Sequence, residues 1–205
     1  MILIADYGVG NIFSLQSSFK FIGEEAYLTK DADKLKQADK IILPGVGAFE
    51  DAAKKLKSSG LWDAITQEVS KGKPLLGVCL GMQMLFEKSY EYGEHQGLSF
   101  IKGDICPIKP DIEDGLKIPH IGWNKLIFPK DRERSKLFKY FTEGDCVYFV
   151  HSYYAKNCDK SVTSVADYGG ILTASVENGN VYGTQFHPEK SGKAGLGILK
   201  AFTEV

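Results

Sequence analysis

Residues 73–87 read Lys-Pro-Leu-Leu-Gly-Val-Cys-Leu-Gly-Met-Gln-Met-Leu-Phe-Glu, and the rest of the chain is organised around them. Leu75–Val78 is an apolar run of strand length, and from Leu80 onward the apolar residues are spaced as on one helix face. The residues that would share this face are Met82, Leu85 and Phe86. Cys79 lies between the two halves, with Gly77 and Gly81 two residues to either side. The stretch therefore predicts a strand, a sharp turn and a helix, with a thiol at the apex.

Gly-x-Cys-x-Gly is the cysteine version of the nucleophile elbow, whose flanking glycines let a strained turn pack tightly. The start of a helix would place backbone N–H groups and partial positive charge near the Cys79 sulfur, which favours the thiolate. A buried structural cysteine is the alternative, because free cysteine is among the most buried residue types. For an isolated cysteine this alternative is the commoner one, so other parts of the chain must decide.

The chain has 205 residues, 43% hydrophobic content and a formal net charge of −1. This size suits one domain with a full core, and we expect residues 1–205 to form a single domain. No basic stripe points to a nucleic-acid partner. No apolar run approaches the ~20 residues that span a bilayer, and the N-terminus lacks the features of a signal peptide. We expect no membrane association.

The cysteines and histidines argue against a metal site. The four cysteines show no Cys-x-x-Cys spacing, and the four histidines form no His-x-x-x-His pair. This pattern fits neither a disulfide scaffold nor a zinc site, and it indicates a reducing, cytoplasmic environment. The glycines at residues 8–10 lack the third glycine of a dinucleotide fingerprint, so no cofactor is expected. The cysteines that we interpret as packing residues are Cys106, Cys146 and Cys158.

Strand-like and helical segments alternate along the first ninety residues. Strands are expected at 2–5, 25–29, 40–44 and 75–78, and helices at 12–22, 31–38, 49–56 and 61–69, with Asn11 as the N-cap of the first helix. Alternation of this kind implies right-handed crossovers and a largely parallel sheet. Ligands of such sheets bind at the carboxyl ends of strands, where residues 44–47 and Cys79 both lie.

The pattern changes after residue 93. Short β-branched and aromatic runs occur at 121–128, 147–150, 162–166, 171–176 and 181–186, with turn residues between them, and a helical stripe closes the chain at 196–202. An antiparallel section therefore joins the parallel core. We predict an α/β fold with a mixed, mostly parallel central sheet, flanked by helices and extended by an additional antiparallel section.

A cysteine nucleophile needs a base, and the base needs a group that orients it. His187 follows a predicted strand, and Glu189 lies two residues later with Pro188 restricting the backbone between them. A lone histidine is more often structural, but His-Pro-Glu at a strand end opposite a cysteine elbow favours catalysis. An oxyanion hole is also needed. Its two candidate N–H groups lie at Leu80 and in the segment Val46–Gly47, where glycine allows close approach.

Together these segments resemble the class I (triad) glutamine amidotransferases, over essentially the whole chain. The elbow and residues 185–191, Gln-Phe-His-Pro-Glu-Lys-Ser, are typical of this class. The resemblance implies a flavodoxin-like fold in which Cys79 attacks the side-chain amide of glutamine, and His187, oriented by Glu189, handles the protons. Ammonia leaves first, and water then releases glutamate from the thioester. The residues that the resemblance assigns to glutamine binding are Gly47, Gln83, Glu91, Ser152 and Tyr153.

Residues 43–47 and 119–124 resemble the branch of this family that serves histidine biosynthesis. Its members pass ammonia to a (β/α)8-barrel cyclase subunit, which forms imidazole glycerol phosphate and an aminoimidazole carboxamide ribonucleotide. The resemblance implies a heterodimer with Pro119, Trp123 and Lys190 near its interface. Trp123 fits the aromatic enrichment of interfaces, although a buried core tryptophan is the alternative. The resemblance also implies low activity until the partner binds its ligand, and rotation of the backbone at 45–47 is a plausible switch.

Three other functions stay open. The first is a paralogous glutaminase subunit that feeds another synthetase, such as a sugar amidotransferase. The second is a cysteine peptidase or γ-glutamyl hydrolase that acts alone. The third is a non-catalytic binding subunit, which would have no physical need of a complete set of Cys79, His187 and Glu189.

Overall fold

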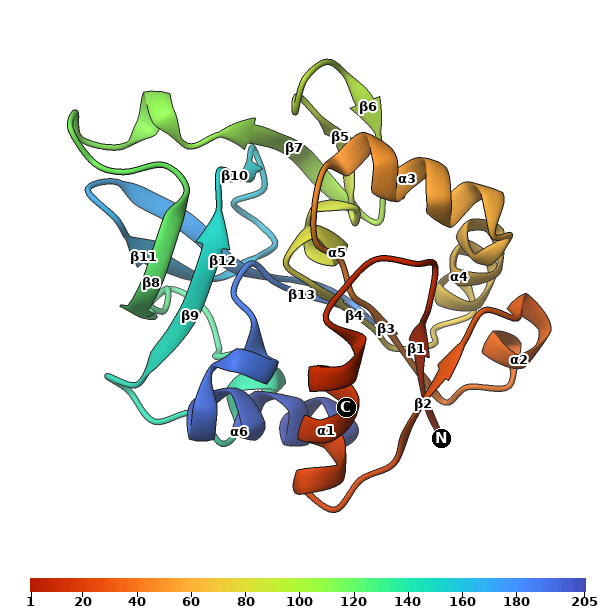
Figure 1. Ribbon diagram of the computed structural model, residues 1–205. Coiled ribbons are helices and arrows are strands. Elements are labelled where there is room, and N and C mark those ends of the chain that lie inside the picture. The colour runs from red at the N-terminus through yellow and green to blue at the C-terminus, as the bar shows by residue number, and fades with distance from the viewer.

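The computed structural model describes residues 1–205 and is built on a seven-stranded sheet (Figure 1). The strand order is β11-β12-β13-β4-β3-β1-β2. Five neighbouring strands are parallel: β1 (Ile2–Ala5), β2 (Ala26–Thr29), β3 (Lys40–Leu43), β4 (Leu75–Val78) and β13 (Val181–Thr184). The two antiparallel strands at one edge are β12 (Ile171–Asn178) and β11 (Val162–Asp167). This is the mixed, mostly parallel sheet that the sequence predicts.

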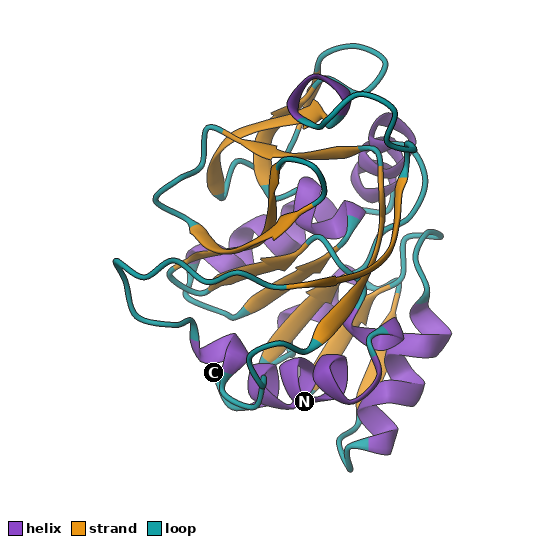
Figure 2. Cartoon of the chain, turned by 90° about the vertical axis from the view of Figure 1, so that its left-hand side faces the viewer, coloured by secondary structure: helices purple, strands orange, loops and turns teal.

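Helices cover both faces of the sheet (Figure 2). Side chains alternate between the two faces of a strand, so Ile2 and Ile4 pack into one core while Leu3 and Ala5 pack into another. The helices of the first core are α1 (Ile12–Phe21) and α6 (Gly192–Thr203), and those of the second are α2 (Ala32–Lys36), α3 (Phe49–Ser58) and α4 (Leu61–Ser70). Burial on both faces explains why the parallel strands are continuous apolar runs. None of the helices is long and apolar enough to cross a membrane.

Two smaller sheets extend the fold. One has the strand order β10-β7-β5-β6, and the other pairs β8 with β9. Their strands are β5 (Phe86–Ser89), β6 (His95–Gln96), β7 (Ile101–Pro107), β8 (His120–Lys125), β9 (Cys146–His151) and β10 (Tyr153–Lys156). Three short 3-10 helices are η1 (Lys109–Asp111), η2 (Lys136–Phe138) and η3 (Pro188–Lys190). The sequence pattern predicts β8 and β9 but not the four-stranded sheet, because glycine and charged residues interrupt the apolar pattern of that sheet, as in Ile-Lys-Gly-Asp-Ile-Cys-Pro of β7.

The predicted helix after Cys79 is wrong in its length. Helix α5 (Leu80–Gln83) is a single turn, and Phe86 begins β5 instead of sharing a helix face. The backbone N–H groups of residues 98–101 donate to the carbonyls of Met84, Leu85 and Phe86, so these acceptors are not free to continue the helix. A one-turn helix also has a small dipole, so the argument that it favours the thiolate is weaker than the sequence suggests.

Candidate functional site

A hollow of about 280 Å³ lies at the carboxyl ends of β3 and β4. It gathers segments that are far apart in the chain, and twelve residues line it: Val46, Gly47, Cys79, Leu80, Gln83, Glu91, Pro119, Val150, His151, Ser152, Tyr153 and His187. All of the predicted oxyanion and glutamine-binding residues are in this set, together with the predicted nucleophile and base. Of the other predicted site residues, Glu189 lies behind His187, while Trp123 and Lys190 do not line the hollow.

Cys79 stands at a strained turn, as the Gly-x-Cys-x-Gly pattern predicts. Its φ of +54° lies in the left-handed region, which is uncommon for any residue with a Cβ. A Cβ on Gly81 would lie 1.9 Å from the carbonyl oxygen of Leu43, and a Cβ on Gly77 would lie 2.7 Å from the oxygen of Gly81. The backbone N–H of Cys79 donates to Thr184 O at 2.7 Å. The elbow is therefore clamped between β3 and β13, which fixes the sulfur in the hollow.

His187 and Glu189 meet as the His-Pro-Glu pattern predicts. The Nδ1 atom of His187 lies 2.8 Å from Glu189 Oε1, and both side chains are almost fully buried. Because Nδ1 donates to the carboxylate, Nε2 is the nitrogen left for chemistry, and it has no hydrogen-bond partner of normal geometry. Burial alone would lower the pKa of His187, but the Cys79 sulfur and the Glu189 carboxylate outweigh it and raise this pKa to about 10. The arrangement favours a protonated imidazole beside the sulfur.

Asn11 corrects one sequence prediction. It precedes α1, but its side chain makes no capping hydrogen bond to the helix. Instead its Nδ2 donates to Glu189 Oε1 at 3.4 Å, so the amide faces the carboxylate rather than the free N–H groups of the helix. A cap would need the Asn11 oxygen to accept from the helix N–H groups, whereas the carboxylate attracts the NH₂ end of this amide and so orients it differently. Spacing could not find this contact, because 178 residues separate the two side chains.

Gln83 is buried, although it lies on a short helix at the edge of the hollow. Its Nε2 donates to Tyr153 O and to Gln185 Oε1, both at 3.1 Å. Both N–H bonds of the amide are thus used within the protein, and only Oε1 remains for a ligand. The Glu91 carboxylate accepts the backbone N–H of Phe49 at 2.5 Å, at the start of α3. Helix α5 and the turn after β5 therefore both offer hydrogen-bond acceptors to the hollow, which suits a cationic group.

The segment at residues 45–47 lies directly against the elbow. A Cβ on Gly45 would lie 2.7 Å from the backbone nitrogen of Gly81, so only glycine fits there. Gly47 has a φ of +91°, and a Cβ on it would meet open space. This contact brings the predicted oxyanion segment next to Leu80 and Cys79. The oxyanion role of Val46, Gly47 and Leu80 stays a prediction, as does the proposed rotation of the glycine backbone.

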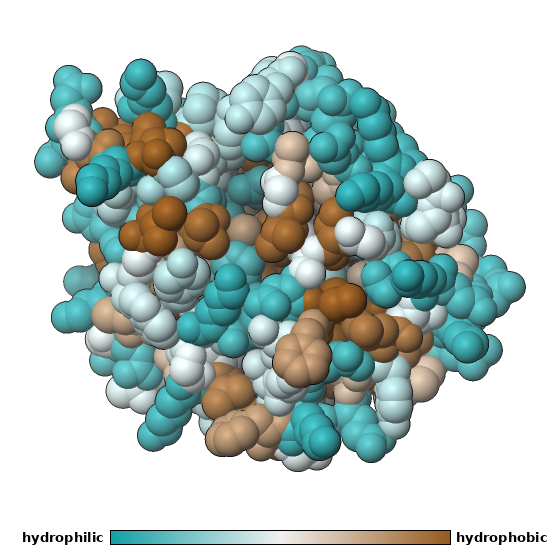
Figure 3. All heavy atoms as spheres, viewed as in Figure 1, coloured by the Kyte–Doolittle hydropathy of each residue, from teal (hydrophilic) through white to brown (hydrophobic).

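The predicted partner residues lie at the surface beside the hollow. Trp123 is 54% exposed, which excludes the alternative of a buried core tryptophan, and its neighbour Ile121 on β8 is 57% exposed. The rings of Trp123 and Tyr148 meet edge to face at 5.9 Å, and Lys190 Nζ lies 5.7 Å from the Tyr148 ring. Pro119 is exposed and also lines the hollow. Figure 3 shows apolar groups among hydrophilic ones on the face seen in Figure 1.

A buried histidine pair is a part of the site that the sequence analysis missed. His151 lines the hollow, and its Nδ1 lies 2.9 Å from Tyr153 O, so this nitrogen donates to the carbonyl. Its Nε2 lies 3.1 Å from Nδ1 of His120, whose ring stacks between Phe149 and Tyr168. Both histidines stand in segments that resemble the family, but no spacing rule pairs residues 31 positions apart. The pair links the exposed strand β8 to the wall of the hollow.

Acidification is expected to destabilise the fold through His151. Burial lowers the pKa of His151 to about 3, whereas an unfolded histidine titrates near 6.5. Between these values the unfolded chain binds a proton that the folded chain does not, so stability falls as pH drops from 6.5 towards 3. The loss from this residue between pH 7 and pH 5 is about 2 kcal/mol. Urea unfolding at both pH values should show a smaller loss for His151→Gln than for the wild type, and equal losses would contradict the prediction.

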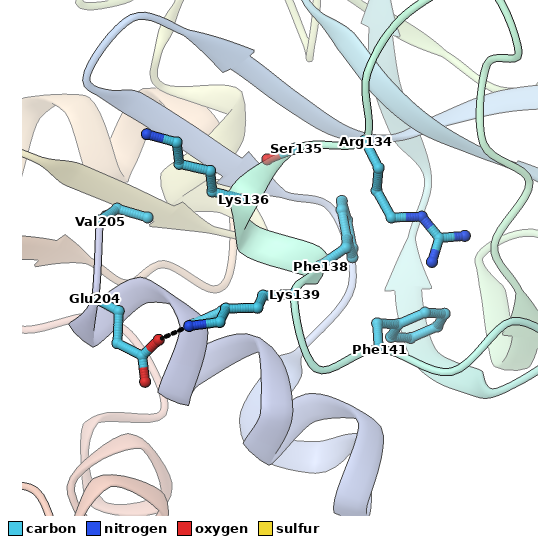
Figure 4. Close-up of a pocket in the computed structure, with 9 residues that line it drawn as sticks. Arg134, Ser135, Lys136, Phe138, Lys139, Phe141, Glu204 and Val205 are labelled. Atoms are coloured by element: carbon cyan, nitrogen blue, oxygen red, sulfur yellow. Dashed lines mark hydrogen bonds and ion pairs between the residues drawn. The ribbon is translucent and has the colours of Figure 1, made fainter.

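A second hollow, larger than the first, lies elsewhere. It has a volume of about 560 Å³ and lies between η2 and the end of α6, as Figure 4 shows. Its charged groups include Arg134, Lys136 and Lys139, and the last is paired with Glu204 at 2.7 Å. No cysteine or histidine lines it, so size alone does not identify the reactive site. No group of three or more His, Cys, Asp or Glu side chains is placed to hold a metal ion.

Comparison with known proteins points to the same family as the geometry of the site does. The family model described as glutamine amidotransferase class-I matches residues 5–204. Two relatives named imidazole glycerol phosphate synthase subunit HisH are each 46% identical. The match to the relative from Caldanaerobacter subterraneus subsp. tengcongensis covers 100% of this chain and 98% of that protein. The match to the relative from Aquifex aeolicus covers 98% of this chain and 94% of that protein.

Solved structures confirm the predicted fold class. A structure described as glutamine amidotransferase superposes with a TM-score of 0.74 at 17% identity, covering 98% of each chain. The structure of PurLQS from Thermotoga maritima gives a TM-score of 0.72 at 20% identity, covering 99% of this chain and 97% of that one. At these identities the likeness concerns the fold alone.

Proposed function

Because the chain belongs to the class I glutamine amidotransferases, we propose that it is the glutaminase subunit of an imidazole glycerol phosphate synthase. The observation that carries this proposal is the 46% identity to such subunits over the whole chain. The site supports it with a thiol on a strained turn, a buried histidine–carboxylate pair and a neighbouring glycine segment. The activity is hydrolysis of the glutamine amide to glutamate and ammonia, and lyase activity belongs to the complex.

The reaction begins when the Cys79 sulfur attacks the amide carbon of glutamine. A new C–S bond forms, and the carbonyl oxygen becomes an oxyanion that the N–H groups of Leu80 and the Val46–Gly47 segment would stabilise. Protonated His187 gives its proton to the departing nitrogen, the C–N bond breaks and ammonia leaves. The neutral imidazole then takes a proton from water, which attacks the γ-glutamyl thioester. Glutamate leaves, and the sulfur and the imidazolium are restored.

The glutamine would lie in the hollow with its α-ammonium group near the acceptors of Gln83 and Glu91. Gln83 supports this orientation because only its Oε1 is free, and Glu91 adds a carboxylate that Phe49 N–H holds in place. Ser152 and Tyr153 also line the hollow, and Tyr153 O accepts from Gln83. We infer a heterodimer with a cytoplasmic (β/α)8-barrel cyclase, and the exposed Trp123 face beside Pro119 is where that partner would bind.

The experiment that tests the proposal measures glutamate formation by the purified chain, with and without the cyclase and its ribonucleotide ligand. We expect weak activity alone and a large stimulation in the complete mixture, since activity without an acceptor would waste ammonia. Unchanged activity on addition of the cyclase would overturn the pathway. Copurification with a different synthetase would then point to a paralogous subunit with the same chemistry.

A further inference from the structure

The Gln185 side chain contacts the reactive sulfur and has no role in the mechanism above. It follows β13, its backbone N–H donates to Ala174 O at 2.8 Å, and its side chain is completely buried. The side-chain amide touches two residues of the hollow. Its Oε1 lies 3.1 Å from Gln83 Nε2, and its Nε2 lies 3.8 Å from Cys79 Sγ. A buried amide that contacts the sulfur at one end and a wall residue at the other is positioned for more than packing.

The direction of these hydrogen bonds follows from a single carbonyl. Tyr153 O can only accept, so the Gln83 atom that faces it at 3.1 Å must be the amide nitrogen. The same nitrogen faces Gln185, so the Gln185 atom that meets it must be the acceptor Oε1. The remaining end of the Gln185 amide, which faces Cys79, is therefore the N–H donor. The chain of contacts runs from Tyr153 O through Gln83 and Gln185 to the sulfur, with every donor pointing towards its acceptor.

A hydrogen-bond donor that points at a cysteine sulfur stabilises the thiolate and the thiol to different extents. A thiolate is a much better acceptor than a thiol, so an N–H bond stabilises the charged form selectively. Of the other polar neighbours of Cys79 Sγ, Val150 O at 4.0 Å can only accept and so cannot help a thiolate, and the protonated His187 must give its proton to the departing nitrogen during the reaction. Because Gln185 is completely buried, water cannot replace its N–H if the amide is removed. Gln185 thus supplies a donor to the thiolate from within the protein.

We propose that Gln185 is a catalytic residue whose amide N–H holds the Cys79 thiolate in its attacking position. Through Gln83 the same amide ties the sulfur to the Tyr153 carbonyl in the wall of the hollow. This role deepens the proposed function and rests on Cys79 being its nucleophile. It predicts that the reactivity of the sulfur depends on residue 185 even in the absence of glutamine.

The test is alkylation of Cys79 by iodoacetamide in the full-length chain between pH 6 and pH 9. Mass spectrometry of the tryptic peptide 72–88 follows this thiol alone, since the peptide has no other cysteine. Gln185→Met keeps the length of the side chain but removes the donor. We expect its alkylation rate at pH 7 to fall about tenfold and its pH profile to move to higher pH. In the complex with the cyclase, kcat should fall while KM for glutamine changes less than about twofold.

Thr184→Val is the matched control. Thr184 is the neighbouring buried residue, and its hydroxyl has no hydrogen-bond partner, so this variant should alkylate like the wild type. If Gln185→Met does not fold, Gln185→Glu keeps the shape and the acceptor for Gln83, and its alkylation at pH 8 should also fall about tenfold. A wild-type rate and pH profile in a folded residue-185 variant would overturn the proposal. Alkylation needs no glutamine turnover, so failure of the proposed function would be visible separately.

Discussion

Cys79→Ala is expected to abolish glutamine-dependent turnover, with a loss of about 10⁴-fold or more. Without the sulfur no thioester can form, and no other thiol lines the hollow. The variant should fold, because Cys79 is small and alanine at its left-handed φ carries the same strain. The measurement is glutamate formation in the presence of the cyclase and its ligand.

The same variant should leave the ammonia-dependent reaction intact. If the cyclase performs its own chemistry, added ammonium replaces the missing glutaminase product, and the Cys79→Ala complex should cyclise at the wild-type rate. Cys106→Ala is a suitable control, because Cys106 is a thiol of β7 that does not line the hollow. Glutamine hydrolysis that survives in Cys79→Ala would show that another residue is the nucleophile.

Gly81→Ala is expected to destabilise the protein by about 3 kcal/mol or more and to lower glutamine turnover at least a hundredfold. Alanine is the better helix former by about 1 kcal/mol, so propensity alone predicts a gain. The clash decides the outcome, because the new Cβ would lie 1.9 Å from the carbonyl oxygen of Leu43. To relieve this clash, β3 and the elbow must move apart. That movement displaces both the Cys79 sulfur and the glycine segment at residues 45–47.

The matched control is Gly197→Ala, which is also helical. Its Cβ would lie 3.1 Å from Tyr140 O, so a shift of a few tenths of an ångström in a surface residue relieves the contact. Urea unfolding should therefore show a change of less than about 1 kcal/mol for this variant. A Gly81→Ala protein with wild-type stability and wild-type activity would show that the elbow is not clamped by β3.

Local chemistry explains which parts of the site could be predicted. The elbow is visible from sequence because Gly77, Cys79 and Gly81 impose its geometry within five residues, and His187 with Glu189 forms its contact across one proline. The parallel strands are visible because burial on both faces makes them apolar. The roles assigned to these residues follow from their chemistry and from the family, and the hollow brings them together.

The parts that sequence could not predict depend on contacts between distant segments. The sequence predicts that Asn11 caps a helix, but its side chain contacts Glu189, which lies 178 residues later in the chain. The sequence also predicts that the helix continues after Gln83, but the carbonyls of residues 84–86 accept hydrogen bonds from the backbone N–H groups of residues 98–101. The pair of His120 and His151 forms because β8 and β9 are antiparallel partners in that register. No local pattern encodes such pairings, since each requires the tertiary structure to exist first.

The amide of Gln83 has a consequence for substrate choice. Its two N–H bonds are committed to Tyr153 and Gln185, so the wall presents an oxygen, and the nearby Glu91 presents a carboxylate. A free amino acid brings an ammonium group with three hydrogens and a positive charge to these oxygens. A glutamine inside a peptide brings one neutral N–H and a bulky acyl group in its place. If Gln83 and Glu91 bind the substrate as we propose, we expect the hollow to select the free amino acid, which would protect the glutamine residues of other proteins from this thiol.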